Sequence, residues 1–356
     1  MKTVKRLAAL ILASIMVLAL AACGSSASSS GSSGGSSAAP GDGKVYKITV
    51  GGTVPDEHPI SQGLFKFKEV AEELSNGRLD VEVYDNNTLG GSRELVEAVQ
   101  SGDIQMCETS QSTFASFTDE LMSVGLPFLF KNREAAYSFF DSDVGQQLAD
   151  AVLQDTGVRV MGYFENGVRQ LTNSKHAVVT PADMKGLKIR VMESPIYIEM
   201  FTEMGANPMP MSFSELYTAL QQGTVDGQDN PYAIVCTNAF YEVQKYMTDL
   251  SHTFDVTCLS MNNDFYESLP DDLKDVVDQA AAEAVKLERQ KSVDSEQDYI
   301  KKIQDAGTNM TFLTDEQRSA FKDSCSGTYD FFKTKYSPSV TLDTVMAEAQ
   351  KVNAAN

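Results

Sequence analysis

The chain has 356 residues, with 29 lysines and arginines against 49 aspartates and glutamates, which gives a formal net charge of -20. This acidic balance excludes the basic surface with which proteins bind nucleic acid. Residues 44–356 are too many for one ordinary hydrophobic core, so two domains are expected. No apolar run after the N-terminal segment approaches the roughly 18 residues of a membrane-spanning helix.

The first 22 residues have the layout of a secretory signal peptide. Lys2, Lys5 and Arg6 form a basic start, and an apolar run over 7–22 follows, too short for a stable membrane span. Small residues precede Cys23, as in a bacterial lipobox, which predicts that Cys23 becomes the lipidated first residue of the mature chain. The alternative is an ordinary signal peptide cut near a coincidental cysteine. Loss of the three basic residues takes the formal charge from -20 to -23.

Residues 24–43 are rich in glycine and serine, the composition of a flexible tether. Together with the lipidated Cys23, they would link the membrane to the folded part of the chain. The tether contains GSSGG, which matches the G-x-S-x-G pattern of hydrolases. That motif requires a strand before it and a helix after it. A low-complexity segment offers neither, so we interpret the match as coincidental.

Strands and helices alternate after the tether. The apolar patterns and glycine turns predict a strand at 45–50, a helix at 61–75, a strand at 79–84, a helix at 92–101 and a strand at 104–107. This β-α-β-α-β order favours an α/β layer with parallel strand pairing.

Helix start and stop signals divide the middle of the chain. Thr180-Pro181 and Ser194-Pro195 predict helices with proline in the first turn, the second of them ending at Gly205. The S-x-x-E sequence that begins at Ser212 predicts a capping box. The helix that it opens is expected to stop at Gly223, the favoured residue just past a helix end.

Residues 271–306 contain neither glycine nor proline. A helix through all of them would be about 54 Å long at 1.5 Å per residue, long enough to brace two domains. A break near Ser292 is the alternative. A second capping-box pattern, which begins at Thr314, predicts another helix.

The histidines give no sign of a metal site or of catalysis. His58, His176 and His252 lie in different segments without metal-binding spacing, and no phosphate-binding or dinucleotide-binding loop follows any strand. Nothing marks a nucleophile, so neither a metal nor a cofactor is expected.

Four cysteines follow Cys23, and none of them forms a C-x-x-C pair. Cys107, Cys236, Cys258 and Cys325 are therefore expected to be buried free thiols. A disulfide is the alternative, since the signal peptide directs the chain out of the cytoplasm.

Arginines in two consecutive predicted strands are the main chemical signal. The segment GLKIRVMESP (186–195) alternates apolar and polar residues, which places Arg190 in a strand just before a chain reversal, and Arg169 lies in the preceding strand. Each alone reads as a solvated surface charge. Together they can converge on one anion, because a guanidinium meets a carboxylate with two parallel hydrogen bonds. Arg93 stands at the start of the helix after Gly90.

A resemblance to a known family rests on four segments. MKGLKIRVMESPIYIEMFTEMGANPMPMSFSELYTALQQGTVDGQDNP (184–231) resembles the solute-binding subunits of TRAP transporters, the DctP-like family. The same is true of ENGVRQLTNSK (165–175), FYEVQKY (240–246) and LGGSRELVEAVQSGDIQM (89–106). The similarity extends from about residue 46 to past residue 300.

The resemblance implies a two-domain α/β fold of the periplasmic-binding-protein (Venus flytrap) type, with a long helix that spans both domains. Domain I is expected to comprise residues 44–167 and 256–295, and domain II residues 168–255 and 296–349.

The resemblance also implies a set of ligand-binding residues. The family motif carries glutamate where this chain has Asp229, a position that is not expected to contact the ligand. The residues expected at the ligand are Arg190 as the main carboxylate-binding residue, Arg169 in support, Asn230 as a donor, Phe213 packed on the ligand, Arg93 from the first domain, Glu193 at a discriminating position, and His58 and Glu57 in a loop that faces the cleft.

The function implied by the resemblance is transport, not catalysis. The protein is expected to be an extracytoplasmic monomer that closes around a small organic acid and delivers it to the small and large membrane subunits of a TRAP transporter. The lipid on Cys23 would anchor it to the membrane. Glu193 and Glu57 would accept hydrogen bonds from hydroxyls, which favours a sugar acid over a C4-dicarboxylate. An extracytoplasmic enzyme and a ligand sensor are the alternatives.

Overall fold

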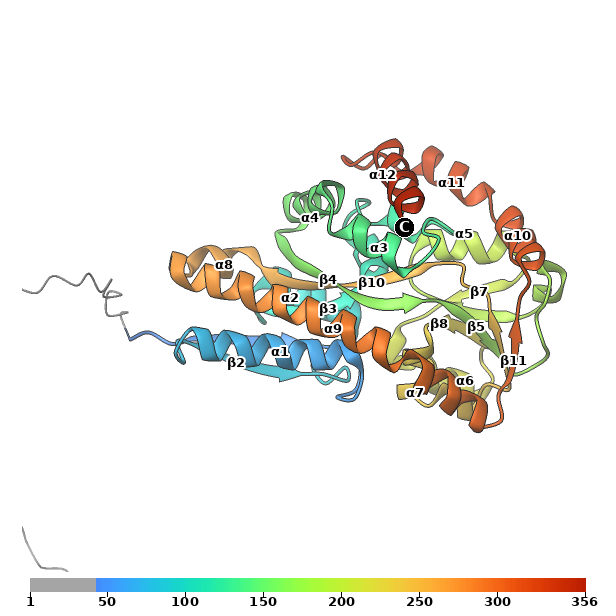
Figure 1. Cartoon of the computed structure of the whole chain (residues 1–356), viewed down its shortest axis with the longest axis horizontal. Helices are drawn as coiled ribbons and strands as arrows, with labels where there is room; N and C mark the ends of the chain where they lie inside the picture. The colour runs from blue at the N-terminus through green and yellow to red at the C-terminus, as the bar shows by residue number, and fades with distance from the viewer. Residues whose placement is uncertain (1–42) are drawn as a thin grey trace, which may run out of the picture. The chain divides into compact units, whose positions relative to one another are not determined.

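Two mixed β-sheets organise residues 43–356, the part of the chain that the computed structural model describes (Figure 1). The predicted signal peptide, the lipidation at Cys23 and nearly all of the predicted tether lie outside the described residues. The five-stranded sheet contains, in spatial order, β2 (Leu79–Tyr84), β1 (Tyr46–Gly51), β3 (Met106–Ser110), β10 (Phe254–Asn262) and β4 (Val158–Val168). The six-stranded sheet contains β11 (Asn309–Phe312), β9 (Tyr246–Asp249), β5 (Gln170–Asn173), β8 (Gly227–Asn230), β6 (Lys188–Val191) and β7 (Asn207–Pro210).

The predicted parallel pairing is confirmed in the five-stranded sheet. β1 pairs in parallel with both β2 and β3, and the connecting helices are α1 (Pro59–Leu74) and α2 (Ser92–Ser101). β10 is antiparallel to its neighbours β3 and β4. Side chains alternate across the sheet, so that Met106 and Cys107, consecutive in β3, are buried in cores on opposite faces.

Helices cover both faces of the five-stranded sheet. One core joins α1 and the long helix α9 (Asp271–Asp305), and it contains Leu64, Phe67 and Val277. The opposite core joins α2, α3 (Arg133–Phe140), α4 (Asp143–Thr156) and the last helix, α12 (Leu342–Ala355). α12 thus packs on α3 and α4, beside the first sheet, although the chain reaches it from the second (Figure 1). The predicted domain limits stay a prediction.

The long helix predicted before Gly307 is confirmed, and it is not interrupted at Ser292. The Ser292 hydroxyl donates to Oε1 of Glu288 at 2.7 Å, one turn earlier. α9 packs against α1 and also against α7 (Tyr232–Thr237), which follows β8 of the second sheet. One rigid element therefore contacts the layers of both sheets.

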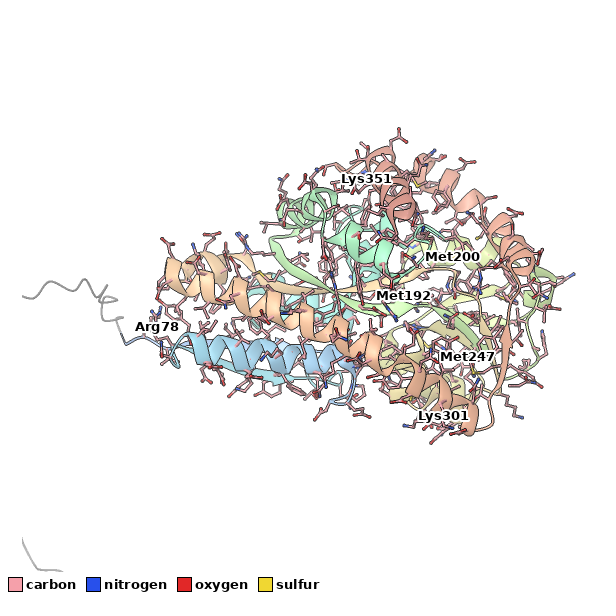
Figure 2. All side chains as sticks on the ribbon, viewed as in Figure 1. Arg78, Met192, Met200, Met247, Lys301 and Lys351 are labelled. Carbon is pink, nitrogen blue, oxygen red and sulfur yellow. The ribbon has the colours of Figure 1, made fainter. Side chains whose placement is uncertain are left out.

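The remaining elements surround the second sheet and the connections between the two sheets. Fully buried methionines such as Met200 and Met247 lie close to the six-stranded sheet, whereas Lys301 and Lys351 project from α9 and α12 (Figure 2). These elements are α5 (Pro195–Glu203), α6 (Leu216–Gln222), α8 (Asn263–Ser268), α10 (Asp315–Ser324) and α11 (Gly327–Lys335), with the short 3-10 helices Gln111–Ser116, Met122–Gly125, Pro181–Met184, Phe213–Glu215 and Phe240–Glu242.

One of the two predicted capping boxes forms. Gln317 and Thr314 exchange hydrogen bonds at the start of α10, at 2.8 and 3.3 Å. The box predicted at Ser212 is wrong, because its hydroxyl lies 3.0 Å from the hydroxyl of Ser214 and a 3-10 turn precedes α6. α6 nevertheless ends at Gly223 as predicted, with a φ of 71° that suits glycine.

The four cysteines of residues 43–356 are buried free thiols, as the sequence predicted. Cys107 of β3 and Cys258 of β10 lie on neighbouring strands of the five-stranded sheet and belong to one core. Cys236 and Cys325 lie in two other cores. Burial raises the pKa of Cys325 to about 12. These side chains behave as small apolar groups.

Candidate ligand-binding cleft

A cavity between the two sheets is lined by residues from both. It holds about 670 Å³ of space, part of which is open to solvent. Glu108 and Ser110 of β3 and Thr257 of β10 line it from the five-stranded sheet, and Arg190 of β6 and Asn230 of β8 line it from the six-stranded sheet. A concave site with a few converging polar groups is typical of small-molecule binding.

Six of the eight residues predicted at the ligand line this cavity. They come from both sides of the cleft and from helix starts as well as strands: Arg93, Arg169, Arg190, Glu193, Phe213 and Asn230.

His58 and Glu57 do not line the cavity. His58 is fully buried, and its Nδ1 accepts a hydrogen bond from the backbone N–H of Ile60 at 3.1 Å, so it caps α1. Burial lowers the pKa of His58 to about 3, which keeps the ring neutral. Glu57, one residue earlier, is exposed to solvent. The loop turns inward at His58 because the helix needs a cap there, and the loop therefore does not present these two side chains to the cleft.

Arg190 is a buried cation without a carboxylate partner. Only 3% of its surface is exposed, and its Nε donates to the backbone carbonyl of Met211 at 2.9 Å. It forms no ion pair with any carboxylate of residues 43–356. Burial, together with the charge of Arg169, lowers the pKa of Arg190 to about 10. Burial of a charge is costly unless the charge is paired. Its environment therefore favours an anion.

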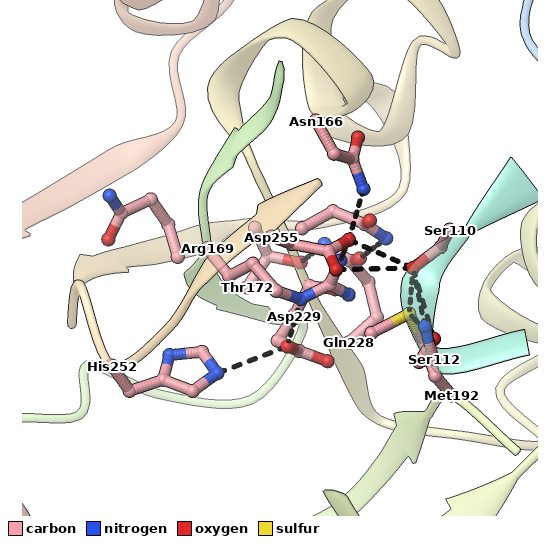
Figure 3. A network of polar contacts seen from close by, with 12 residues as sticks. Ser110, Ser112, Asn166, Arg169, Thr172, Met192, Gln228, Asp229, His252 and Asp255 are labelled. Atoms are coloured by element: carbon pink, nitrogen blue, oxygen red, sulfur yellow. Dashed lines mark hydrogen bonds and ion pairs between the residues drawn. The ribbon is translucent and has the colours of Figure 1, made fainter. Parts of the chain in front are cut away.

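Arg169, by contrast, is fully compensated inside the protein (Figure 3). Its Nε donates to Oδ2 of Asp229 at 2.6 Å, its Nη1 to Oδ2 of Asp255 at 3.1 Å, and its Nη2 to the backbone carbonyl of Asp229. His252 also contacts Oδ2 of Asp229, at 3.1 Å. Although burial alone raises it, the Arg169 charge and the His252 contact hold the pKa of Asp229 well below its usual value.

Asp255 links the two sheets through the same network. It accepts hydrogen bonds from Ser110 at 3.1 Å, Gln111 at 3.3 Å and Asn166 at 2.5 Å, in addition to that from Arg169 (Figure 3). Burial raises the pKa of Asp255, and these donors oppose that rise. Arg169 lies between β4 and β5, and these contacts hold it against residues of both sheets.

Asp229 and Asp255 were not predicted from the sequence as the partners of Arg169. The sequence offers one indication, which is that an arginine next to a buried strand needs an acidic partner nearby. β5 and β8 pair so that Leu171 lies opposite Asp229. Asp255, which is 86 residues from Arg169 in sequence, had no local signal.

The other lining residues differ in exposure. Asn230 is buried, and its Nδ2 donates to Oε1 of Gln228 at 2.5 Å. Phe213 packs edge-on against Phe240, with ring centroids 6.1 Å apart. Arg93 lies at the rim, exposed and bound through Nε to Glu97 at 2.9 Å. The cleft therefore has a buried cationic wall and an exposed rim.

Residues 43–356 offer neither a metal-binding cluster nor a membrane-spanning helix. No cluster of three side chains in this part of the chain is arranged to hold a metal ion. None of its helices combines the length and the apolar character needed to cross a membrane.

Comparison with known proteins gives consistent matches over nearly the whole described chain. The chain is 34% identical over 258 residues to the 2,3-diketo-L-gulonate-binding periplasmic protein YiaO of Escherichia coli K12, which covers 72% of this chain and 78% of that protein. It is 32% identical to the C4-dicarboxylate-binding periplasmic protein DctP of Shewanella loihica, and this match covers 81% of this chain and 86% of that protein.

Solved structures match equally well. The sugar acid binding protein DctPAm of Advenella mimigardefordensis, in complex with galactonate, has a TM-score of 0.84 at 32% identity, covering 87% of this chain and 99% of that one. A TRAP periplasmic solute-binding protein of Shewanella oneidensis with bound succinate has a TM-score of 0.82 at 30% identity, and this match covers 87% of this chain and 99% of that one. Residues 50–335 also match the family described as bacterial extracellular solute-binding protein, family 7. The resemblance stated from the sequence is thereby confirmed, and the chain belongs to the DctP family of bacterial extracellular solute-binding proteins.

Proposed function

We propose that this protein captures a small organic acid outside the cytoplasm and delivers it to the membrane subunits of a TRAP transporter. The observation that carries the proposal is the state of Arg190, a buried guanidinium in the cleft without a carboxylate partner. Its Nε is used by Met211, so its Nη1 and Nη2 atoms are the donors left for a carboxylate.

Arg169, Asn230 and Phe213 would complete the ligand site. Arg169 lines the same cavity and adds positive charge beside Arg190, although three of its five N–H groups donate to Asp229 and Asp255. Asn230 lines the wall next to it, and Phe213 offers an apolar surface. This arrangement supports an anionic head group held at one wall of the cleft.

A sugar acid is the ligand that we favour. YiaO is named for 2,3-diketo-L-gulonate and DctPAm was solved with galactonate, whereas other relatives are named for, or hold, C4-dicarboxylates. In this chain the cleft contains one unpaired buried arginine, which matches one carboxylate. Glu193 at the rim would repel a second carboxylate and accept from hydroxyls.

Capture would proceed by closure of the two walls around the ligand. A ligand favours the closed state only through contacts that the open state lacks. A molecule held by Arg190 on one sheet and by β3 side chains on the other would supply such contacts. Closure also excludes water, which strengthens the attraction between Arg190 and the carboxylate.

Anchoring and delivery complete the proposal. Lipid on Cys23 would hold the protein at the membrane, and the tether would give it reach toward the transporter. Mass spectrometry of the N-terminal peptide from cell membranes tests the anchor: an unmodified Cys23, or a cut elsewhere, would contradict it. Loss of acid uptake on gene deletion would separate a transport role from a sensing role.

Isothermal titration calorimetry of the purified protein against organic acids tests the binding function. The panel contains aldonates and uronates of four to six carbons, succinate, malate and their neutral sugar counterparts. We expect at least one carboxylate to bind with a Kd in the micromolar range or tighter, about -8 kcal/mol, and its neutral counterpart not to bind. Tight binding of a neutral sugar with no binding of any acid would refute the proposal.

A further inference from the structure

Glu108 is a buried carboxyl on the wall of the cleft that belongs to the five-stranded sheet. It lies in β3, has no exposed surface and lines the cavity. Its Oε2 accepts from the backbone N–H and the hydroxyl of Thr53, at 3.4 and 3.2 Å. Its Oε1 makes no hydrogen bond of normal length and angle within residues 43–356, although the Thr257 hydroxyl is close enough to this carboxyl to oppose the rise in its pKa. No lysine, arginine or histidine of this part of the chain forms an ion pair with it.

Glu108 and Asp229 are both buried acids, but they differ in what faces them. Burial, with a further contribution from the charge of Asp255, raises the pKa of Glu108 to about 7. Asp229 has a pKa held well below its usual value, because Arg169 and His252 contact it. The contrast reflects the absence of a cation at Glu108. Such a carboxyl is best satisfied by neutral hydrogen-bond donors.

The cleft therefore offers a ligand two complementary ends. Arg190, on the six-stranded sheet, is a cation without an anion, and Glu108, on the five-stranded sheet, is a carboxyl without a cation. The other two arginines at the cleft are already engaged: Arg169 by Asp229 and Asp255, and Arg93 by Glu97. A second carboxylate on a ligand would thus meet Glu108 and no free buried cation.

Hydroxyl side chains line the same cavity as Glu108 and can exchange hydrogen bonds with a polyol. They are Thr53, Ser92, Ser110, Ser112, Thr113, Ser116, Ser212 and Thr257.

We propose that Glu108 is the specificity-determining residue of the cleft: it accepts hydrogen bonds from hydroxyls at the end of the ligand remote from Arg190, and so selects a polyhydroxylated acid with a single carboxylate against a dicarboxylate. The inference rests on the proposed function, because it assumes that Arg190 holds the carboxylate. It assigns the main part in the choice of ligand class to a residue of β3, in addition to the part proposed for the rim residue Glu193.

Calorimetry on the wild-type protein and on Glu108→Gln tests the inference. The probes are a panel of aldonates and uronates of four to six carbons, with succinate and malate as dicarboxylates. We expect the wild type to bind its best hydroxylated monocarboxylate at least 100-fold more tightly than either dicarboxylate. The titrations are run at pH 8, above the pKa of about 7, so that Glu108 is ionised in the wild type. Glu108→Gln, which keeps the shape and removes the negative charge, should lower this ratio at least tenfold. Glu108→Asp, which keeps the charge, should preserve the preference even if affinity falls.

Glu120→Gln is the matched control. Glu120 is also buried, accepts hydrogen bonds from the backbone N–H groups of Ser339 and Val340, and lies outside the cavity, so the ratio should stay at its wild-type value. Dicarboxylates binding the wild type as tightly as sugar acids would overturn the inference and leave the proposed function intact. An unchanged ratio in Glu108→Gln would also overturn it. Failure of every acid to bind the wild type would instead refute the proposed function.

Discussion

The Nε of Arg169 donates to Oδ2 of Asp229 across 2.6 Å, and neither side chain has any exposed surface. Arg190, which lines the same cavity, forms no ion pair with a carboxylate of residues 43–356. Two arginines that look equivalent in sequence therefore have different physical roles. Arg169 is paired with acids of the protein, whereas Arg190 is left without one and is the residue that we propose binds the carboxylate of a ligand.

This difference predicts opposite effects on stability. Arg169→Met leaves Asp229 and Asp255 buried without their cation, and removal of one partner from a buried pair costs about 3–5 kcal/mol. Arg190→Met removes a buried charge that has no partner, so it should leave the free energy of unfolding unchanged or raise it. Urea denaturation of the ligand-free proteins measures both values. Equal losses of stability in the two variants would contradict the assigned roles.

Ligand affinity should respond most strongly at Arg190. Arg190→Lys keeps a positive charge but loses the planar fork, so the Kd for the best acid of the panel should rise at least tenfold, about 1.4 kcal/mol. Arg159→Lys is the control, because Arg159 binds Asn263 and Glu267 and does not line the cavity. A folded Arg190→Lys protein with wild-type affinity would rule out Arg190 as the carboxylate-binding residue.

The parts of this protein that sequence could predict are those set by local pattern. Alternating apolar residues and glycine turns predicted the parallel β1–β2–β3 layer, and the lack of glycine and proline predicted α9. Arg190 was predictable as a strand residue, but its lack of a partner depends on the strands around it. That property became visible only in three dimensions.

The burial of His58 and Glu108 could not be predicted from the sequence, for a physical reason in each case. His58 precedes a proline in a polar loop, a pattern that gives no sign of burial, yet the start of α1 needs an acceptor and the imidazole supplies it. Glu108 was overlooked because the predicted strand ended at residue 107, whereas β3 extends to Ser110 and carries Glu108 inside it. Its importance depends on Arg190 of the six-stranded sheet, which lines the same cavity but lies about 80 residues later in the chain.

The free thiols should resist modification in the native protein. Cys107, Cys236, Cys258 and Cys325 are buried, and burial raises the pKa of each of them. Because the thiolate is the reactive form, iodoacetamide at pH 8 should label these four only after unfolding. Reductant should leave the Tm unchanged, since no disulfide joins them. Peptide mapping of the alkylated protein checks the labelling, and a disulfide-linked peptide among the four would contradict the assignment.

Glu288 should make stability depend on pH. This carboxyl lies in the middle of α9, fully buried, and accepts from the backbone N–H of Glu165 at 2.8 Å and from the hydroxyl of Ser292 at 2.7 Å. Burial, reinforced by the charge of Glu165, raises the pKa of Glu288 to about 8. The folded state therefore keeps a proton that the unfolded state loses above its ordinary pKa of about 4.3. The stability that this proton contributes is fully present below about pH 4 and is lost as the pH rises toward 8.

Glu288→Gln mimics the protonated group at every pH, because its amide can still accept from Glu165 and donate to Ser292. The wild type should lose stability relative to this variant between pH 5 and 8, by at most about 1.4 kcal/mol per pH unit for a single proton. Glu283→Gln, at a partly exposed site on the same helix, should follow the wild-type curve. Denaturation curves at pH 5, 6, 7 and 8 measure the difference. Parallel pH profiles for the wild type and Glu288→Gln would show that Glu288 is ionised in the folded protein and that α9 tolerates a buried charge at its centre.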